Sequence, residues 1–429
     1  MPAILILLVF VAGLLISIPI SSVIGLVSVM PSVFDSTFQA SVTYVIQAMV
    51  SGVNSFPLLA IPMFILSGII MARGGVSKKL FDVFAFFLGK LPGGMPCAVI
   101  ITCLFYGAIS GSAPATVAAV GSMTIPVLLN LGYKKEFAAA TVVVAGGLGV
   151  IIPPSIPMVL YGMASGASVG DMFTAGIVPG LMIAGILMLY AITYSIRKGE
   201  DREKINQEIG SLRAKGFVQI FKEGFWALLS PVIILGSIYG GIASPTEAAV
   251  ISVFYALFIS ICLYRTLKPS DIPAILRETV KTYAPLLFIL ATASAMAKIM
   301  ALMRIPDMIS EAVTGTFTTK IAILLVINAI LLLVGMVMDT SPAILLLTPI
   351  LLPIVQLVGM DEIHFGIMMI VNLAIGFVTP PMGVNLFVAS SLTKIPLMRL
   401  AKFAVPYVVL FLVALALLAV FPQISLCLL

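Results

Sequence analysis

Two proline pairs inside long apolar segments constrain this chain more than any other feature. The segments read GVIIPPS from Gly149 and GFVTPPM from Gly376. Proline removes a backbone hydrogen-bond donor and clashes with the preceding turn, while glycine permits backbone conformations that other residues avoid. Each segment is therefore predicted to be a helix that breaks near its middle. Broken helices at matching places in two halves of a chain are typical of membrane transporters.

The composition is that of a protein embedded in a lipid bilayer. Of the 429 residues, 61% are hydrophobic and 9% are charged. A helix needs about 20 apolar residues to cross a bilayer, and roughly ten such stretches predict an all-α polytopic membrane protein. The net charge of +6 does not indicate a nucleic-acid partner. The basic residues lie mainly in loops between apolar segments, as membrane topology requires.

The amino-terminal stretch predicts the orientation of the chain. Residues 4–30 are expected to form a first membrane helix bent at Pro19, and no Lys or Arg precedes Arg73. This charge pattern disfavours a cleaved signal peptide and places the amino end away from the cytoplasm.

A charged segment divides the chain into two similar halves. Residues 197–224 hold seven basic and five acidic side chains, which predicts a cytoplasmic loop with solvated charges between a first repeat, 1–196, and a second, 225–429. Matching features recur at nearly one offset. Gly149 and Gly376 are 227 residues apart, as are Pro153 and Pro380, and Pro114 and Pro342 are 228 apart. Two inverted structural repeats are therefore predicted.

Each repeat is predicted to hold a re-entrant helical hairpin followed by a broken helix. The hairpins cover about residues 95–129 and 321–355, and the broken helices cover about residues 136–163 and 363–392. Irregular backbone at a hairpin tip is tolerated in a bilayer only where it is buried in protein or lines a polar cavity.

The other segments are expected to form a scaffold around this core. Residues 225–263 fit either two short helices or one long broken helix. Residues 36–53 and 270–281 are amphipathic, so we expect them to lie along the membrane interface as arms that brace a mobile core. This arrangement would be an elevator-type ion-transporter fold.

Polar residues precede a proline at both hairpin tips, in SGSAPAT from Ser110 and DTSPAI from Asp339. Ser or Thr can cap free backbone donors and proline fits a first helical turn, so both returning half-helices should present positive dipole ends at the tip. Such an end suits an anionic substrate. The predicted substrate contacts are Ser112, Thr116, Pro154, Ser341 and Pro381.

Oxygen atoms at the tips and breaks predict two sites for a coupling Na⁺ ion. A small hard cation needs several oxygen ligands, which unwound backbone, hydroxyl and carboxylate groups supply. Asp339 is the most informative acid, because a carboxylate within a membrane segment is costly and marks function. For a single Ser or Thr, the alternative is a hydrogen bond to a carbonyl of its own helix. Site one comprises Ser110, Gly111, Ser112, Gly149 and Ser155, and site two comprises Gly335, Asp339, Thr340, Gly376, Thr379 and Asn385.

Other charged or titratable residues favour structural roles. Glu247 and Lys298 fit helix-end positions whose charges reach the membrane interface. His364, the one histidine, fits a surface or helix-start position better than a catalytic one. The chain has no Gly-rich phosphate-binding loop ending in Gly-Lys-Ser/Thr, so energy should come from an ion gradient or a partner.

The combined motifs resemble the large membrane subunit of tripartite ATP-independent periplasmic (TRAP) transporters over essentially the whole chain. The motifs are the two hairpin tips, the two Gly-x-x-x-Pro-Pro breaks and GGIASPTEAAV at residues 240–250. Each is weak alone, and together they are specific. The resemblance implies that the ion ligands lie at the tips and the opposing breaks, which are residues 110–116 with 149–155 and residues 339–341 with 376–385.

Membership would also imply a function and partners. The expected protein is a sodium-coupled elevator transporter of a bacterial inner membrane. It would work with a small four-helix membrane subunit and a periplasmic substrate-binding protein that delivers an organic acid, either a C4-dicarboxylate or sialic acid. We expect a separate large subunit and not a fusion of the small and large subunits.

Three alternatives stay open at this point. A related ion-coupled carboxylate transporter could have the same architecture and work without a binding protein. An intramembrane protease is suggested only by Ser110 or Asp339 at depth, and the sequence offers neither a suitable base nor a second embedded aspartate. A passive channel can also contain broken helices, but paired hairpins and breaks are better explained by alternating access.

Overall fold

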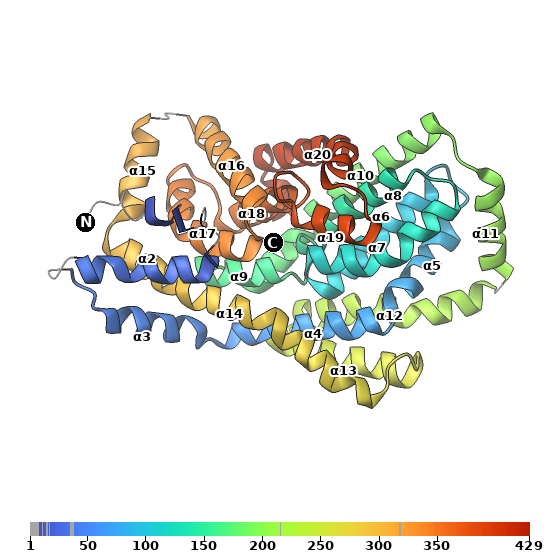
Figure 1. Cartoon of the computed structure of the whole chain (residues 1–429), viewed down its shortest axis with the longest axis horizontal. Helices are drawn as coiled ribbons and strands as arrows, with labels where there is room; N and C mark the ends of the chain where they lie inside the picture. The colour runs from blue at the N-terminus through green and yellow to red at the C-terminus, as the bar shows by residue number, and fades with distance from the viewer. Residues whose placement is uncertain are drawn as a thin grey trace.

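The computed structural model of the chain is helical throughout the residues that it describes (Figure 1). These residues are 8–10, 12–13, 16, 18–34, 38–214, 216–316 and 319–429. Within them, nine helical segments are long and apolar enough to cross a membrane. The predicted all-α, multi-pass membrane architecture is confirmed.

The bounds of the helices follow the chain in two groups. The first group is α2 Ile20–Phe34, α3 Val42–Val53, the 3-10 turn η1 Phe56–Leu59, α4 Ala60–Arg73, α5 Val76–Leu88, α6 Gly94–Ser110, α7 Ala113–Asn130, α8 Lys135–Gly146, the 3-10 turn η2 Gly147–Val150, α9 Ile156–Ser165 and α10 Val169–Lys198. The second group is α11 Arg202–Ala214, α12 Phe217–Tyr239, α13 Pro245–Leu257, the π-helical turn η3 Phe258–Leu263, the 3-10 turn η4 Pro269–Asp271, α14 Ile272–Leu302, α15 Ile305–Thr316, α16 Lys320–Val337, α17 Thr340–Leu357, α18 Glu362–Gly376, α19 Val384–Thr393, α20 Leu397–Val420 and α21 Gln423–Leu426.

The amino-terminal segment differs from the single bent helix expected over residues 4–30. Residues 4–7 lie outside the described residues, Pro19 lies outside any helix, and α2 begins only at Ile20. Proline lacks the backbone N–H that would continue a preceding helix, so the chain starts a new helix after it. That new helix packs against α14.

Helices α6 and α7 are the two arms of the first hairpin and pack against each other. The first arm ends because Gly111 adopts the left-handed conformation (φ +60°), which glycine reaches without a Cβ clash. The second arm begins after Ser112, with Pro114 in its first turn. The following broken helix consists of α8, η2 and α9, interrupted by Pro153 and Pro154.

Helices α16 and α17 form the second hairpin, joined at Met338 and Asp339. Helices α18 and α19 are the two parts of the second broken helix, and Pro380 and Pro381 lie between them. Both proline pairs are joined by a cis peptide bond.

The two halves make reciprocal contacts. The returning arm α7 of the first hairpin packs against α19, and the returning arm α17 of the second hairpin packs against α9. Each returning arm also packs against the first part of the broken helix in its own half, α8 or α18. The halves therefore contain equivalent elements with equivalent partners, while the inverted relation between them stays a prediction.

Helices α4, α12, α13 and α14 form a band along the lower edge of Figure 1, with both hairpins above it. Residues 225–263 comprise most of α12, which begins before this segment, then a short link, α13 and the π-helical turn η3. Residues 270–281 form the end of η4 and the beginning of α14, one helix of 31 residues, and their expected place along the membrane interface stays a prediction. No glycine or paired proline interrupts the sequence between Ile272 and Leu302, so the helix continues.

The charged segment 197–224 is mostly helical, and one of its charges is buried. Solvation was expected for all of them, but the Glu200 side chain is only 2% exposed. It accepts hydrogen bonds from the Gly93 backbone N–H (2.9 Å) and the Tyr133 hydroxyl, and it pairs with Arg202 at 3.1 Å. Burial, followed by the bond to Glu200, raises the pKa of the Tyr133 hydroxyl. The segment is thereby anchored to the base of the first hairpin.

Candidate functional site

The tip of the first hairpin is a small, internally bonded cluster of hydroxyl groups. Ser110 Oγ lies 3.0 Å from Thr116 Oγ1, and the Thr116 hydroxyl donates to the Ser112 carbonyl at 2.8 Å. The Ser110 hydroxyl also reaches that carbonyl, at 3.3 Å. Ser112 does not cap α7 with its side chain, contrary to expectation. The neighbouring hydroxyls instead hold the tip in place.

The first break is in direct contact with this tip. A Cβ atom on Gly149 would lie 2.5 Å from Thr116 Oγ1 and 2.8 Å from the Ser112 carbonyl oxygen, so only glycine fits. A Cβ atom on Gly107, in the arriving arm α6, would lie 2.6 Å from the Cα of Gly149. The Ser155 hydroxyl donates to the Val150 carbonyl at 2.6 Å. The five residues of predicted site one are thus brought together, each with partners inside the protein.

The tip of the second hairpin carries a carboxylate in place of this hydroxyl cluster. Asp339 caps α17, and its Oδ1 atom accepts hydrogen bonds from the Thr340 backbone N–H (2.6 Å) and hydroxyl (3.3 Å). No cation pairs with Asp339 among the described residues. Its side chain is exposed to the space beside the tip. The second tip therefore presents a carboxyl group held in place by Thr340, where the first tip presents none.

The second break meets its hairpin through a pair of glycines. A Cβ atom on Gly376 would lie 2.3 to 2.6 Å from the backbone atoms of Gly335 in α16. The Met382 backbone N–H then donates to the Met336 carbonyl at 3.2 Å. The Thr379 hydroxyl, in the break, donates to the Ile375 carbonyl near the end of α18 at 2.8 Å, a local bond like the alternative considered for single hydroxyls.

Sequence reasoning missed Gly107, although the spacing contained a signal for it. Gly107 contacts the first break as Gly335 contacts the second, and the two glycines are 228 residues apart. This is the offset already noted for the hairpin prolines. The glycine contact between the arriving arm and the break is therefore a feature of both halves.

Asn385 connects the second break to the first half of the chain. Its Nδ2 donates to the Val143 carbonyl of α8 at 3.0 Å. Its Oδ1 atom is buried and has no hydrogen-bond partner among the described residues. A buried amide oxygen without a partner is costly, and it is the kind of oxygen that a small cation prefers.

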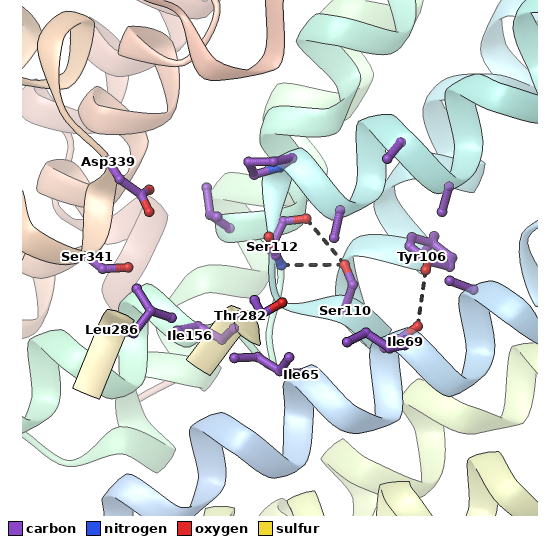
Figure 2. Close-up of a pocket in the computed structure, with 18 of the residues that line it drawn as sticks. Ile65, Ile69, Tyr106, Ser110, Ser112, Ile156, Thr282, Leu286, Asp339 and Ser341 are labelled. Atoms are coloured by element: carbon purple, nitrogen blue, oxygen red, sulfur yellow. Dashed lines mark hydrogen bonds between the residues drawn. The ribbon is translucent and has the colours of Figure 1, made fainter. Parts of the chain in front are cut away.

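Both hairpin tips open into one cavity of about 620 Å³, here called the central cavity (Figure 2). Figure 2 shows Ser110 and Ser112 on one side of it and Asp339 and Ser341 on another. Thr340 and Phe377 also line it. The predicted substrate contacts Ser112 and Ser341 therefore face a common space, whereas Thr116, Pro154 and Pro381 are not among the lining residues. Thr116 is buried within its tip.

Sequence reasoning missed two charged residues that line the central cavity. Arg73, the last residue of α4, and Glu278, in α14, both line it and form an ion pair at 2.5 Å. They come from different halves of the chain, 205 residues apart, and no motif marks either of them. Only packing of α4 against α14 brings them together.

Two residues outside the cavity have the structural roles that were considered for them. Glu247 accepts hydrogen bonds at 2.8 Å from the backbone N–H and the hydroxyl of Ser244, which completes a capping box at the start of α13. His364 lies in the first turn of α18 but is buried, with Nδ1 2.7 Å from Ser425 Oγ. A helix-start position is confirmed for both, and the surface alternative for His364 is wrong.

Comparison with protein families gives a match over nearly the whole chain. Residues 7–424 match the family described as tripartite ATP-independent periplasmic transporter, DctM component. An isethionate TRAP transporter permease protein, DctMQ, of Oleidesulfovibrio alaskensis is 44% identical over 97% of this chain, which spans 64% of that protein's length. C4-dicarboxylate TRAP transporter large permease proteins, DctM, are 41% identical in Pseudomonas aeruginosa (87% of this chain, 86% of that one) and 37% identical in Rhodobacter capsulatus (100% and 99%).

Solved structures with the same fold are more distant in sequence. The YdaH transporter of Alcanivorax borkumensis superposes with a TM-score of 0.64 at 16% identity, covering 97% of this chain and 98% of that one. MtrF of Neisseria gonorrhoeae gives a TM-score of 0.64 at 14% identity and 94% of each chain. At such identities the likeness establishes the fold alone.

Proposed function

The chain belongs to the DctM family of TRAP transporter large permeases, and we propose that it performs sodium-coupled uptake of a small organic anion across a bacterial inner membrane. Its relatives are transport permeases, so it is a multi-pass membrane transporter subunit and not an enzyme. The coupling ion, the substrate and the movement are the parts of the proposal that need tests.

The observation that carries the proposal is the central cavity with a hairpin tip from each half. Asp339, Thr340 and Ser341 line this cavity from the second tip, and their side chains offer only oxygen atoms, the ligand type that a hard cation takes. The partnerless Oδ1 atom of Asn385 supplies a further buried oxygen. These residues fit a Na⁺ ion held near the second tip. The hydroxyl cluster of the first tip is the candidate site for a second Na⁺ ion.

The substrate proposal follows from the lining of the same cavity. Ser112 and Ser341 offer hydroxyls from opposite tips, and among the described lining residues Arg73, which is paired with Glu278, offers a guanidinium that an anion could share. A guanidinium binds carboxylate and sulfonate oxygens through paired hydrogen bonds. Relatives are named for C4-dicarboxylates, isethionate and ectoine. We therefore propose an organic acid, with C4-dicarboxylates and sialic acid as the first candidates.

We propose an elevator movement because the helices form two packed sets. Both tips belong to the packed set of hairpins and broken helices, whereas α13 and α14 each pack on α4 and form with it a band that contacts the hairpins through α6 and α17. In the proposed cycle, ion binding orders the tips, the substrate carboxylate docks between them, and the hairpin set slides against this band. A gradient of Na⁺ would then drive accumulation.

Two partners are proposed from family membership. A small four-helix membrane subunit would cover part of the apolar exterior, and a periplasmic substrate-binding protein would deliver the anion. The runner-up is transport by this chain alone, with the same cavity but without a binding protein.

The test is uptake of labelled succinate, isethionate and sialic acid into proteoliposomes. The chain is reconstituted with and without its small subunit, its binding protein and an inward Na⁺ gradient. Uptake that requires Na⁺ and both partners would support the proposal. Sodium-driven uptake by the chain alone would favour the runner-up, and uptake indifferent to Na⁺, with K⁺ as the control cation, would overturn sodium coupling.

A further inference from the structure

A second cavity, here called the distal cavity, lies at the other end of the same scaffold helices. It has a volume of about 730 Å³. In α14, the residues that line the central cavity are Glu278, Thr282 and Leu286, and those that line the distal one are Leu290, Ala293, Ser294, Ala297 and Lys298. At about 1.5 Å per residue, Glu278 and Lys298 are about 30 Å apart along the helix. The two cavities are thus successive spaces along one scaffold helix.

The lining of the distal cavity is mostly apolar, and its polar side chains are hydroxyl groups and one described charge. Lys298 is the only charged residue among its described lining residues. The lining hydroxyls come from several elements and are those of Ser51, Ser55, Ser168, Ser244, Thr246 and Ser294. A cation surrounded by hydroxyls, without a carboxylate, is suited to an organic anion that carries its own polar oxygens.

Packing holds the lysine in place. The Lys298 ammonium donates to Ser51 Oγ at 2.9 Å, and the Ser51 hydroxyl donates in turn to the Ala48 carbonyl at 3.1 Å. Helix α3 lies close to α14 here, because a Cβ atom on Gly52 would be 2.2 Å from the Ser294 side chain. Ser51 occupies one of the three ammonium donors, and the other two can serve a ligand.

The scaffold cations of the two cavities differ in their partners. Arg73 in the central cavity is paired with Glu278 at 2.5 Å. Lys298 pairs with no carboxylate among the described residues. The nearby acid Glu247 is engaged by Ser244 as a helix cap and does not line the cavity. An anion therefore meets an unneutralised charge in the distal cavity and a neutralised one in the central cavity.

We propose that the distal cavity is an anion-receiving site in which Lys298 binds the acidic group of the substrate before it reaches the hairpin tips. This inference extends the proposed function and depends on it. The ligand class is a small carboxylate or sulfonate with hydroxyl or carbonyl groups. The open charge at one end and the paired charge at the other favour capture in the distal cavity and release from the central one.

The first experiment compares substitutions at Lys298 in the complete reconstituted transporter. We expect Lys298→Ala to raise the KM for succinate by about tenfold with little change in kcat, because initial capture is weakened. Lys298→Arg should keep most of the capture. Lys281→Ala removes an exposed lysine of the same helix that lines neither cavity, and it should leave KM unchanged.

A second experiment restores or reverses the charge at this position. Lys298→Cys is prepared with the exposed Cys262 and Cys427 replaced by serine, while the buried Cys97 and Cys103 remain. A cationic aminoethyl thiosulfonate reagent should lower KM again, and an anionic sulfonatoethyl reagent should raise it further. This readout depends on charge alone, so it does not require the alanine variant to fold.

Several results would overturn the inference while leaving the proposed function intact. One is a wild-type-like KM in Lys298→Ala, and another is a loss of kcat with unchanged KM, which would place Lys298 in the movement and not in anion capture. Equal effects of the two reagents would also overturn it. If the unmodified transporter takes up no anion at all, the proposed function itself fails.

Discussion

The two hairpin tips are built on the same contact and carry different chemistry. In both halves an arriving arm meets the break through paired glycines, Gly107 with Gly149 and Gly335 with Gly376. The polar groups of the first tip form hydrogen bonds with one another. The second presents the Asp339 carboxylate, and its break holds a buried amide oxygen without a partner.

This difference separates what builds a tip from what a tip can bind. The glycine contact is steric and sets how closely backbone can approach backbone. The polar groups decide whether oxygens are already satisfied by the protein or available to a cation. We therefore expect steric changes to disrupt either tip, whereas loss of one polar group should affect sodium more at the second tip than at the first.

The largest effect is expected on the stability of the protein, from Gly376→Ala. Its Cβ atom would lie within 2.6 Å of three backbone atoms of Gly335, which cannot rotate away as a side chain can. Overpacking of this kind costs about 1 to 3 kcal/mol in the free energy of unfolding. The measurement is thermal unfolding of the purified protein in one detergent. Gly149→Ala should cost less than Gly376→Ala because its nearest contact is a side-chain oxygen.

The matched control for both glycine variants is Gly185→Ala in α10. No atom lies within 4 Å of the Cβ position there, and alanine favours a helix over glycine by about 1 kcal/mol. Gly185→Ala should therefore unfold at or above the wild-type temperature. The close contact at the second break is refuted if Gly376→Ala is as stable as this control.

The next largest effect is expected on sodium activation when Asp339 is replaced. Asp339→Ala removes the only carboxylate at the tips and should raise the half-activating Na⁺ concentration by about tenfold or more, equivalent to about 1.4 kcal/mol. Thr379→Ala should give a smaller shift in the same direction. In both variants, the loss of sodium dependence should be larger than any loss of expression.

Thr393→Ala provides the control for these sodium measurements. Its hydroxyl bonds to the Ala389 carbonyl of its own helix α19 and accepts from the Ile395 backbone N–H, and Thr393 is not among the lining residues of the central cavity. The assignment of the second site would be wrong if sodium activation of uptake were unchanged in both the Asp339 and the Thr379 variants.

A moderate loss of stability is expected from Asn385→Ala. The substitution removes the bond to the Val143 carbonyl, which links the second break to α8, and it removes the partnerless oxygen at the same time. The net loss of stability should be about 1 kcal/mol, because losing a bond is partly offset by losing an unsatisfied group. Addition of Na⁺ should stabilise the wild type against heat more than this variant. Equal stabilisation would exclude Asn385 as an ion ligand.

The smallest effect on sodium activation is expected from Thr116→Val at the first tip, because this hydroxyl is already bonded within the protein. Two hydrogen bonds are lost, and such bonds in membrane proteins contribute about 0.6 kcal/mol each. Thr124→Val on the same helix is the control, because its hydroxyl bonds only to the Val120 carbonyl at 2.8 Å. A sodium shift in Thr116→Val as large as in Asp339→Ala would remove the distinction between the tips.

Some features could be predicted because they depend on local backbone chemistry. Prolines in apolar segments interrupt helices wherever the rest of the chain goes, and the repeat spacing revealed which segments correspond. The same spacing would have identified Gly107 as the partner of Gly335, but an isolated glycine in an apolar run has many possible roles. Asp339 stood out because an acid in such a run is rare.

Other features could not be predicted because they require distant segments to meet. Arg73 and Glu278 are 205 residues apart and become a pair only when α4 packs on α14. Glu200 sits in a segment whose charges look solvated, yet Gly93 and Tyr133 surround it. Residues 270–281, whose sequence is amphipathic, mostly form the beginning of the long helix α14.

The sequence by itself determined that this chain is a helical membrane protein with two broken-helix halves, because apolar length, charge placement and proline chemistry act within single segments. The tertiary structure alone decided which oxygens remain free and which charges are neutralised. Those properties depend on packing between distant segments, where Gly335 contacts Gly376, Glu278 pairs with Arg73, and Lys298 lines a cavity whose described lining has no carboxylate.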